Sequence, residues 1–138
     1  MFDVQPRTEL RGGVPTTVGA PFNFMYNTGM KAMVIGLQGE LGAGKTYFAQ
    51  KFGEVAGVKE QMVSPTFVIM KFYEIDWCGY KKLIHVDAYR LEHEDELLNL
   101  GWNDLIRDPE NLILIEWPER VENILPKDAK RIVFKHEK

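Results

Sequence analysis

The hydrophobic and polar positions of the chain form short apolar runs separated by amphipathic stretches. Residues 33–37 (MVIGL) and 111–116 (NLILIE) are apolar on both faces, which is typical of buried strands in a parallel sheet. Residues 45–56 have apolar side chains at helical spacing, and Gly57 follows as a natural helix stop. The pattern therefore predicts a strand, a Gly-rich loop and a helix in that order.

The middle of the chain predicts a hairpin. Residues 61–67 are expected to form a loop that leads into a strand over residues 68–73. A turn at residues 77–80 then leads to a further strand over residues 82–87. Because a short turn joins antiparallel strands, this hairpin would make the sheet mixed rather than wholly parallel.

The remaining elements are shorter. We expect a helix over residues 91–100, a short helix over residues 103–106 and a last strand over residues 129–135. Glycines and prolines punctuate residues 1–30 heavily, which indicates an irregular lead-in with some packed structure. The alternation of strands and helices favours a three-layer α/β arrangement.

Composition and charge narrow the classes of protein. The chain has 138 residues, of which 45% are hydrophobic, and this is enough for one core without a disulfide or metal staple. The formal net charge is -3, the opposite of the balance typical of proteins that grip a nucleic-acid backbone. The one cysteine, Cys78, cannot form an internal disulfide, which suits a reducing compartment.

No segment of the sequence approaches the roughly 20 apolar residues of a membrane span. The N-terminus has no basic start followed by an apolar stretch, so no signal peptide is expected. These features predict a cytoplasmic protein without a membrane partner.

The segment between the first predicted strand and helix carries a phosphate-binding pattern. Residues 39–46, GELGAGKT, match the P-loop pattern Gly-x-x-x-x-Gly-Lys-Thr in full. The glycines let the main chain approach an anion, and the loop N–H groups and the helix N-terminus attract phosphate. Lys45 is predicted to contact the β- and γ-phosphates, and the Thr46 hydroxyl to bind Mg²⁺. The sequence thus predicts a site for ATP, with GTP as the alternative.

With this loop in place, the predicted fold is a three-layer P-loop NTPase-like α/β domain with a mixed, mainly parallel sheet. Residues 1–138 are expected to form a single nucleotide-binding domain that begins with the irregular lead-in. Ligands of such domains gather at the carboxyl edge of the sheet.

Two predicted strands end in an acid, Asp87 and Glu116. P-loop sites place a carboxylate near the metal at such a strand end, so both are candidate metal ligands or catalytic acids. The alternative for Asp87 is a cap on the residues that follow it. Thr66 is a candidate sensor of Mg²⁺ and the γ-phosphate, or an ordinary turn residue. His85 is expected to be a hydrogen-bonded core histidine rather than a catalyst.

Four motifs together resemble one known family. They are LQGELGAGKT at residues 37–46, SPTF at 64–67, HVDAYRL at 85–91 and IEWPE at 115–119. The combination and its order closely resemble the TsaE family, also called YjeE. The resemblance implies a small bacterial ATPase needed to make threonylcarbamoyladenosine in tRNA. Such a protein binds TsaD and TsaB and supports their turnover by hydrolysing ATP, so that its contact with tRNA is indirect.

The resemblance also implies roles for individual residues. Lys45 would bind phosphate, Thr66 would belong to a switch-like loop, and Trp117 would lie beside the nucleotide, with plain core packing as its alternative. The predicted nucleotide-binding residues are Glu40, Leu41, Gly42, Ala43, Gly44, Lys45, Thr46, Tyr47, Thr66 and Trp117. The predicted catalytic residues are Lys45, Asp87 and Glu116, and the predicted metal ligands are Thr46, Asp87 and Glu116.

The sequence also bears on three functions other than that of an accessory ATPase. A small P-loop kinase would need an Arg-rich lid, but residues 91–111 contain only Arg107. A GTPase is a further alternative, but the sequence has no Asn-Lys-x-Asp segment of the kind that reads guanine in many GTPases. A nucleotide-sensing interaction module with negligible catalysis remains an alternative. No residue is an obvious water-positioning base, and no arginine is clearly placed as a finger, although Arg90 and Arg120 are candidates. An incomplete site of this kind predicts weak hydrolysis alone and stimulation by partners.

Overall fold

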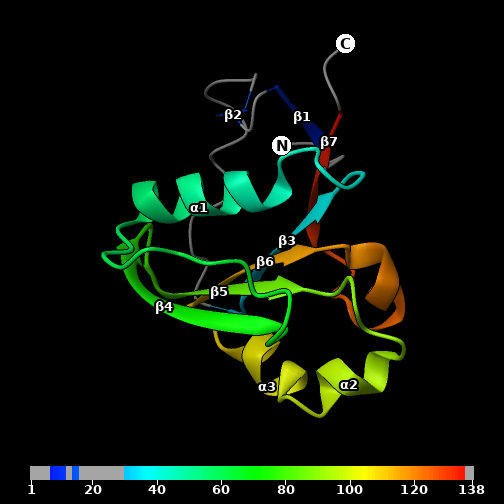
Figure 1. Cartoon of the computed structure of the whole chain (residues 1–138). Helices are drawn as coiled ribbons and strands as arrows, with labels where there is room; N and C mark the ends of the chain where they lie inside the picture. Colours follow the sequence, from blue (N-terminus) through cyan, green and yellow to red (C-terminus); the bar gives the residue numbers. More distant parts are fainter. Residues whose placement is uncertain (1–6, 12–13, 16–29, 136–138) are drawn as a thin grey trace.

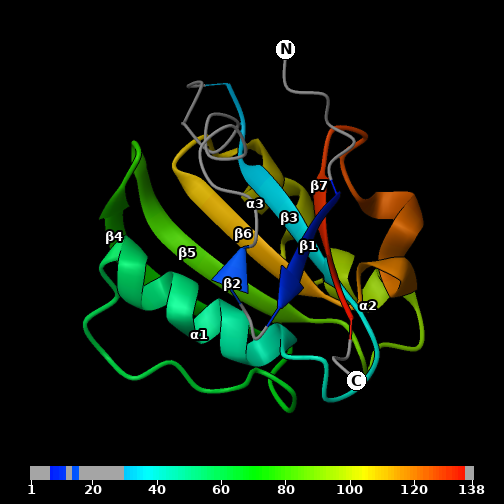
Figure 2. The same ribbon diagram turned by 90° about the horizontal axis from the view of Figure 1, so that it is seen from above.

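The computed structural model describes residues 7–11, 14–15 and 30–135. Their strands form one sheet in the order β2-β1-β7-β3-β6-β5-β4, which Figure 2 displays from above. The strands are β1 (Arg7–Arg11), β2 (Val14–Pro15), β3 (Met33–Gln38), β4 (Met70–Trp77), β5 (Tyr80–Asp87), β6 (Asn111–Glu116) and β7 (Lys130–Phe134). Only β2 and β4 are antiparallel to their neighbours. The prediction of a mixed, mainly parallel sheet in an α/β fold is confirmed.

Helices cover both faces of this sheet (Figure 1). Helix α1 (Lys45–Ala56) packs on one face, while α2 (Glu94–Leu98) and α3 (Trp102–Arg107) pack on the other. A 3₁₀ segment, η2 (Pro118–Ile124), follows β6. In the part of the chain that the structure describes, no helix is long and apolar enough to cross a membrane.

The pleat of the strands divides the apolar side chains between two cores. On β5, Leu83 packs on the α1 side of the sheet, whereas Ile84 packs on the side of α2 and α3. On β6, Leu114 and Ile115 are divided in the same way. Successive side chains of a strand point to opposite faces, so a central strand can be apolar on both. The observed bounds of α1 and β6 are those that the sequence predicts.

The predicted hairpin is confirmed, with longer strands than expected. Strand β4 runs to Trp77 and β5 begins at Tyr80, so that the turn is only Cys78 and Gly79. Both turn residues have positive φ, 53° and 87°, as a two-residue hairpin turn requires. The prediction that a strand begins at residue 68 is wrong. Ile69 has φ 71°, and this turn delays the strand to residue 70.

The prediction of a helix over residues 91–100 is wrong at both ends, because α2 covers only residues 94–98. The Glu96 carboxylate accepts hydrogen bonds from the backbone N–H groups of Glu92 and His93, at 3.1 and 3.3 Å, and thereby fixes a late helix start. Gly101 has φ 91° and separates α2 from α3. Helix α3 and strand β7 lie within one residue of their predicted bounds.

The predicted lead-in over residues 1–30 is only partly described. Strands β1 and β2 fall within it and extend the sheet beyond β7, so an irregular description is wrong for residues 7–11 and 14–15. Apart from residue 30, the other lead-in positions lie outside the described residues. The reason for the miss is that parallel pairing with β7 is a contact between distant parts of the chain, which the local sequence does not encode.

The parallel core of the sheet brings the carboxyl ends of three strands to one edge. Leu37 of β3 is in register with Glu116 of β6, and Glu116 is in register with Asp87 of β5. The Gly-rich loop leaves β3 at this same edge and enters α1. The register of the strands therefore gathers the loop and both predicted acids at one edge of the sheet.

Candidate functional site

A pocket of about 390 Å³ lies at this edge of the sheet, beside the N-terminus of α1. Its lining residues are Leu41, Gly42, Gly44, Lys45, Thr46, Tyr47, Thr66, Asp87, Tyr89, Arg90, Glu116 and Trp117. Ten of the twelve residues that the sequence predicts for the site are among them. The other two are Glu40 and Ala43. The backbone carbonyl of Glu40 accepts bonds from within the loop, and Ala43 packs against the α1-side core.

The Gly-rich loop wraps closely around the base of α1. Gly42 and Gly44 have φ angles of 79° and 103°, a left-handed conformation that costs other residues free energy. The Lys45 ammonium donates hydrogen bonds to the backbone carbonyls of Gly39 and, at 2.9 Å, of Glu40. Lys45, the first residue of α1, is therefore hydrogen-bonded back to the start of the loop that precedes the helix.

The charge of Lys45 is held in a largely dry position. Its side chain is 5% exposed, and burial lowers its pKa below the ordinary value because the charged form is desolvated. Three carboxylates, those of Glu116, Glu119 and Asp87, raise it in opposition. A bound polyanion would offset this desolvation further, so the position favours a ligand that carries negative charge.

Thr46 and Glu116 join the loop to the end of β6. The Thr46 hydroxyl lies 3.0 and 2.9 Å from the two carboxylate oxygens of Glu116 and donates to that carboxylate. Glu116 is 3% exposed, and one of its oxygens also lies 2.7 Å from His85 Nε2. Burying a carboxylate costs free energy unless it is hydrogen-bonded, and Thr46 and His85 supply such partners. The predicted core histidine thus contacts the site acid directly.

Asp87 ties the loop before β4 to the same pocket. Its Oδ2 accepts a hydrogen bond from the Thr66 hydroxyl at 3.1 Å, and Oδ1 accepts one from the backbone N–H of Tyr89 at 3.0 Å. Thr66 in turn lies 2.7 Å from the Ser64 hydroxyl. Asp87 therefore lines the pocket and also caps the turn that follows β5.

Trp117 forms an aromatic wall of the pocket. It has φ 61° and ψ 50°, a costly conformation for a large side chain. Its ring lies 5.0 Å from the Tyr89 ring, and the Lys45 ammonium lies 4.2 Å from its centroid. Gly36 of β3 leaves room for the residue that follows Trp117, since a Cβ on Gly36 would lie 2.8 Å from the Pro118 side chain. Trp117 therefore combines backbone strain with contact to Lys45.

The oxygen atoms at the pocket suit a hard cation. Thr46 with Glu116 and Thr66 with Asp87 present hydroxyl and carboxylate oxygens, the ligand class that Mg²⁺ prefers. Within residues 7–11, 14–15 and 30–135 there is no group of three His, Cys, Asp or Glu residues that could hold a metal alone. That composition fits Mg²⁺, which is commonly bound by one or two carboxylates together with substrate phosphates and water.

The structure distinguishes two arginines that the sequence leaves equivalent. Arg90 lines the pocket, and its guanidinium lies 4.7 Å from the ring of Phe67, which is 84% exposed. Arg120 instead stacks at 5.3 Å from the Tyr89 ring and does not line the pocket. Tyr89 was not singled out from the sequence. Its signal is its place two residues after Asp87, at the turn that leaves the carboxyl edge.

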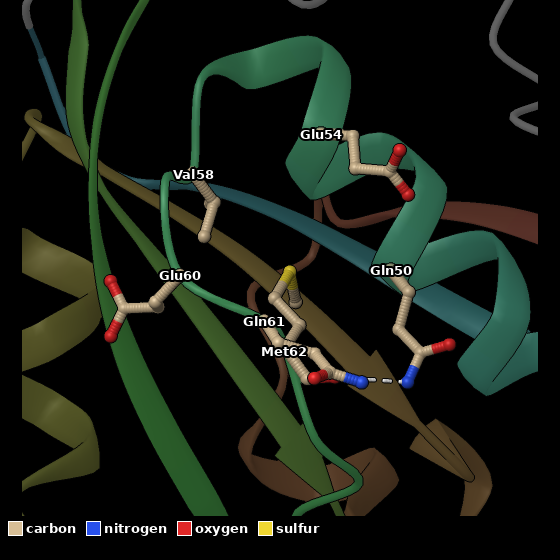
Figure 3. A pocket seen from close by; sticks show the side chains of 6 residues that line it. All are labelled: Gln50, Glu54, Val58, Glu60, Gln61 and Met62. Carbon is tan, nitrogen blue, oxygen red and sulfur yellow. Dashed lines mark hydrogen bonds between the residues drawn. The ribbon is translucent and has the colours of Figure 1, made fainter.

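A second, smaller pocket of about 240 Å³ lies at the opposite end of α1 (Figure 3). It is lined by Gln50, Glu54, Val58, Glu60, Gln61 and Met62. Gln50 donates a hydrogen bond to the backbone carbonyl of Met62 at 3.1 Å. The lining holds two glutamates and no lysine or arginine, so it does not favour a phosphate ligand, and none of the predicted site residues lies there.

Comparison with known proteins adds a family to this geometry. Residues 18–138 match the model of the family described as "Threonylcarbamoyl adenosine biosynthesis protein TsaE". The chain is 40% identical over 102 residues to the tRNA threonylcarbamoyladenosine biosynthesis protein TsaE of Bacillus subtilis, which covers 74% of this chain and 61% of that protein. It is 35% identical over 96 residues to the Haemophilus influenzae protein of the same name, covering 70% and 58%.

A solved structure is similar as well. A crystal structure of YdiB from Bacillus subtilis superposes with a TM-score of 0.56 at 31% identity, and it covers 81% of this chain and 65% of that one. The matches to the two relatives thus span about three-fifths of each relative's own length.

Proposed function

The chain belongs to the TsaE family, and from this premise we propose that it is a magnesium-dependent ATPase that acts in threonylcarbamoyladenosine biosynthesis on tRNA. The observation that carries the proposal is the pocket into which Lys45, Thr46 and Glu116 all open. A loop rich in N–H donors, a buried lysine and a helix N-terminus are suited to a polyphosphate. The chain would work as a single nucleotide-binding domain.

The residues of the pocket divide the work of binding. Lys45, which now donates to loop carbonyls, would donate to the β- and γ-phosphates. Thr46, Glu116 and Asp87 would hold Mg²⁺, which spreads positive charge over the phosphate oxygens when it is bound. Trp117 would flank the nucleotide, since its ring already covers Lys45.

The same residues make slow hydrolysis the expectation for the chain alone. Glu116 is already occupied by Thr46 and His85, and Arg90 packs against the exposed Phe67 ring at the pocket rim. A water-positioning group or an additional cation from a partner would complete such a site. The resemblance to the TsaE family implies TsaD and TsaB as these partners, with tRNA reached through them.

The decisive experiment measures phosphate release from magnesium-ATP by the chain alone and with purified TsaD and TsaB. Lys45→Ala serves as the blank. We expect slow release by the chain alone and at least about a tenfold increase with the partners, lost in the variant. Equal rates with and without the partners would refute the accessory role. Release that depends on a small-molecule acceptor would favour a kinase instead.

A further inference from the structure

His85 shares one face of the sheet with both site acids. It lies two residues before Asp87 on β5, and strand side chains alternate between faces. Leu83, two residues earlier still, packs in the α1-side core together with Leu114 of β6. His85 is in register with Leu114, and Glu116 is two residues further along β6. The pleat and register therefore aim His85 diagonally at Glu116.

The position of the imidazole is fixed on every side. Its side chain is fully buried, and its backbone lies between two paired strands, opposite Lys71 of β4 and Leu114 of β6. Nε2 lies 2.7 Å from Glu116 Oε2. A histidine in this setting has little freedom to rotate, because dense packing surrounds a central strand.

The other ring nitrogen identifies the tautomer. Among the described residues, His85 Nδ1 is a buried side-chain nitrogen with no hydrogen-bond partner. If the hydrogen is on Nε2, the ring donates to Glu116 and Nδ1 keeps only a lone pair. If the hydrogen is on Nδ1, a buried donor is orphaned, which is the rarer and costlier outcome. The geometry is therefore best satisfied by Nε2–H donating to the Glu116 carboxylate.

We propose that His85 is a positioning residue that holds the Glu116 carboxylate in place from the rigid centre of the sheet. Through this bond His85 orients both Glu116 oxygens toward Thr46 and the pocket. The inference rests on the proposed function, since it assigns His85 to the site that would bind magnesium-ATP. Hydrogen bonds that orient a ligating carboxylate typically change metal affinity or activity about 10–100-fold when they are removed.

The first test separates the donor from the packing. His85→Leu removes the N–H donor and fills the buried space with an apolar side chain. His85→Gln keeps an N–H near the Nε2 position. Leu83→Ala is the matched control, because it creates a cavity on the same face of the same strand. Binding of magnesium-ATP and of ADP in the presence of a chelator would be measured by calorimetry for each variant.

We expect His85→Leu to raise the Mg²⁺ concentration for half-maximal nucleotide binding by about 10-fold or more. The affinity for ADP in the presence of a chelator should stay within about twofold of that of the unsubstituted chain, because the phosphate contacts of ADP belong to the loop. His85→Gln should keep the Mg²⁺ dependence of nucleotide binding close to that of the unsubstituted chain. Leu83→Ala should lower the melting temperature and leave this Mg²⁺ dependence unchanged. Unchanged Mg²⁺ dependence in His85→Leu, or equal losses in His85→Leu and His85→Gln, would overturn the inference.

The second test needs neither metal nor activity. Long-range ¹H–¹⁵N spectra of the metal-free protein distinguish a protonated ring nitrogen from a bare one. A proton on His85 Nε2, with a resonance that shifts in Glu116→Ala, is the expected result. A bare Nε2 would overturn the inference even if magnesium-ATP binds normally. Conversely, a chain that binds no ATP at all while Nε2 is protonated would refute the proposed function and leave the hydrogen bond in place.

Discussion

The two ends of α1 have similar backbones and opposite chemistry. Gly44 precedes the helix with φ 103° and Gly57 follows it with φ 98°, and a Cβ on either would meet open space. Each end also borders a pocket. The N-terminal pocket contains Lys45 and the first N–H groups of the helix, whereas the C-terminal pocket contains Glu54 and Glu60.

This difference indicates what a loop beside a helix needs in order to favour a phosphate ligand. A left-handed glycine and a hollow are present at both ends, so neither is sufficient. The helix dipole is positive at its N-terminus and negative at its C-terminus, and the charged side chains reinforce that polarity. Anion binding is therefore expected at one end only, and four sets of variants test this contrast.

The largest effect is expected for the lysine that caps the loop. Lys45→Ala should weaken ATP binding about 100-fold or more, because it removes a buried charge that would donate to the phosphates. Lys51→Ala is the matched control. Lys51 is exposed and pairs with Glu54 at 3.4 Å, so its loss should change the affinity less than about twofold. Titration calorimetry checks both, and equal losses would show that charge near α1, rather than the loop, attracts ATP.

A smaller effect is expected for the hydroxyl that faces Glu116. Thr46→Val should lower Mg²⁺-dependent turnover about 10-fold or more. Its affinity for ADP in the presence of a chelator should stay within about twofold of that of the unsubstituted chain. Gln50→Leu removes a side-chain hydrogen bond further along α1. It should cost about 1 kcal/mol of stability and leave turnover unchanged. Phosphate release over a Mg²⁺ series, with chemical denaturation alongside, measures the pair, and a Mg²⁺ effect in Gln50→Leu would contradict the contrast.

The two terminal glycines give the most closely matched comparison. Gly44→Ala and Gly57→Ala should each destabilise the fold by about 1–2 kcal/mol, because alanine is strained at positive φ. Only Gly44→Ala should also weaken ATP binding, by about 10-fold if the same strain distorts the loop. Denaturant unfolding and calorimetry together check this. An equal loss of affinity in Gly57→Ala would mean that helix stability alone controls the site.

The smallest effect is expected for the acids of the C-terminal pocket. The double substitution Glu54→Gln, Glu60→Gln should change ATP affinity less than about twofold at physiological salt. The rise of α1 places Glu54 roughly 15 Å along the helix from Gly44, which exceeds the screening length of about 8 Å. Glu60 follows the end of the helix. Repeating the calorimetry at low salt sharpens the test, since any residual repulsion should then increase. A large effect at physiological salt would count against local control of the site.

Local pattern was enough for the elements whose signals are local. The apolar run of β6 and the helical spacing of α1 predicted both elements with their observed bounds. The pattern failed where a side chain or a distant strand decides the boundary. Glu96 fixes the start of α2 through two backbone bonds, and β1 joins the sheet only by pairing with β7. Such contacts depend on the folded arrangement.

The candidate chemistry of this protein can be read from its residue types alone. The sequence is enough to recognise the loop of residues 39–46, the acids Asp87 and Glu116, and the family. Glycine, lysine and carboxylate side chains have the same chemical properties at any position in the chain.

Which of these groups lie in contact depends on the fold. Parallel pairing of β5 and β6 put His85 against Glu116, and the course of the chain after each strand put Arg90, but not Arg120, at the pocket. The physical reason is that burial and hydrogen bonding act through space, between residues that the chain order keeps apart.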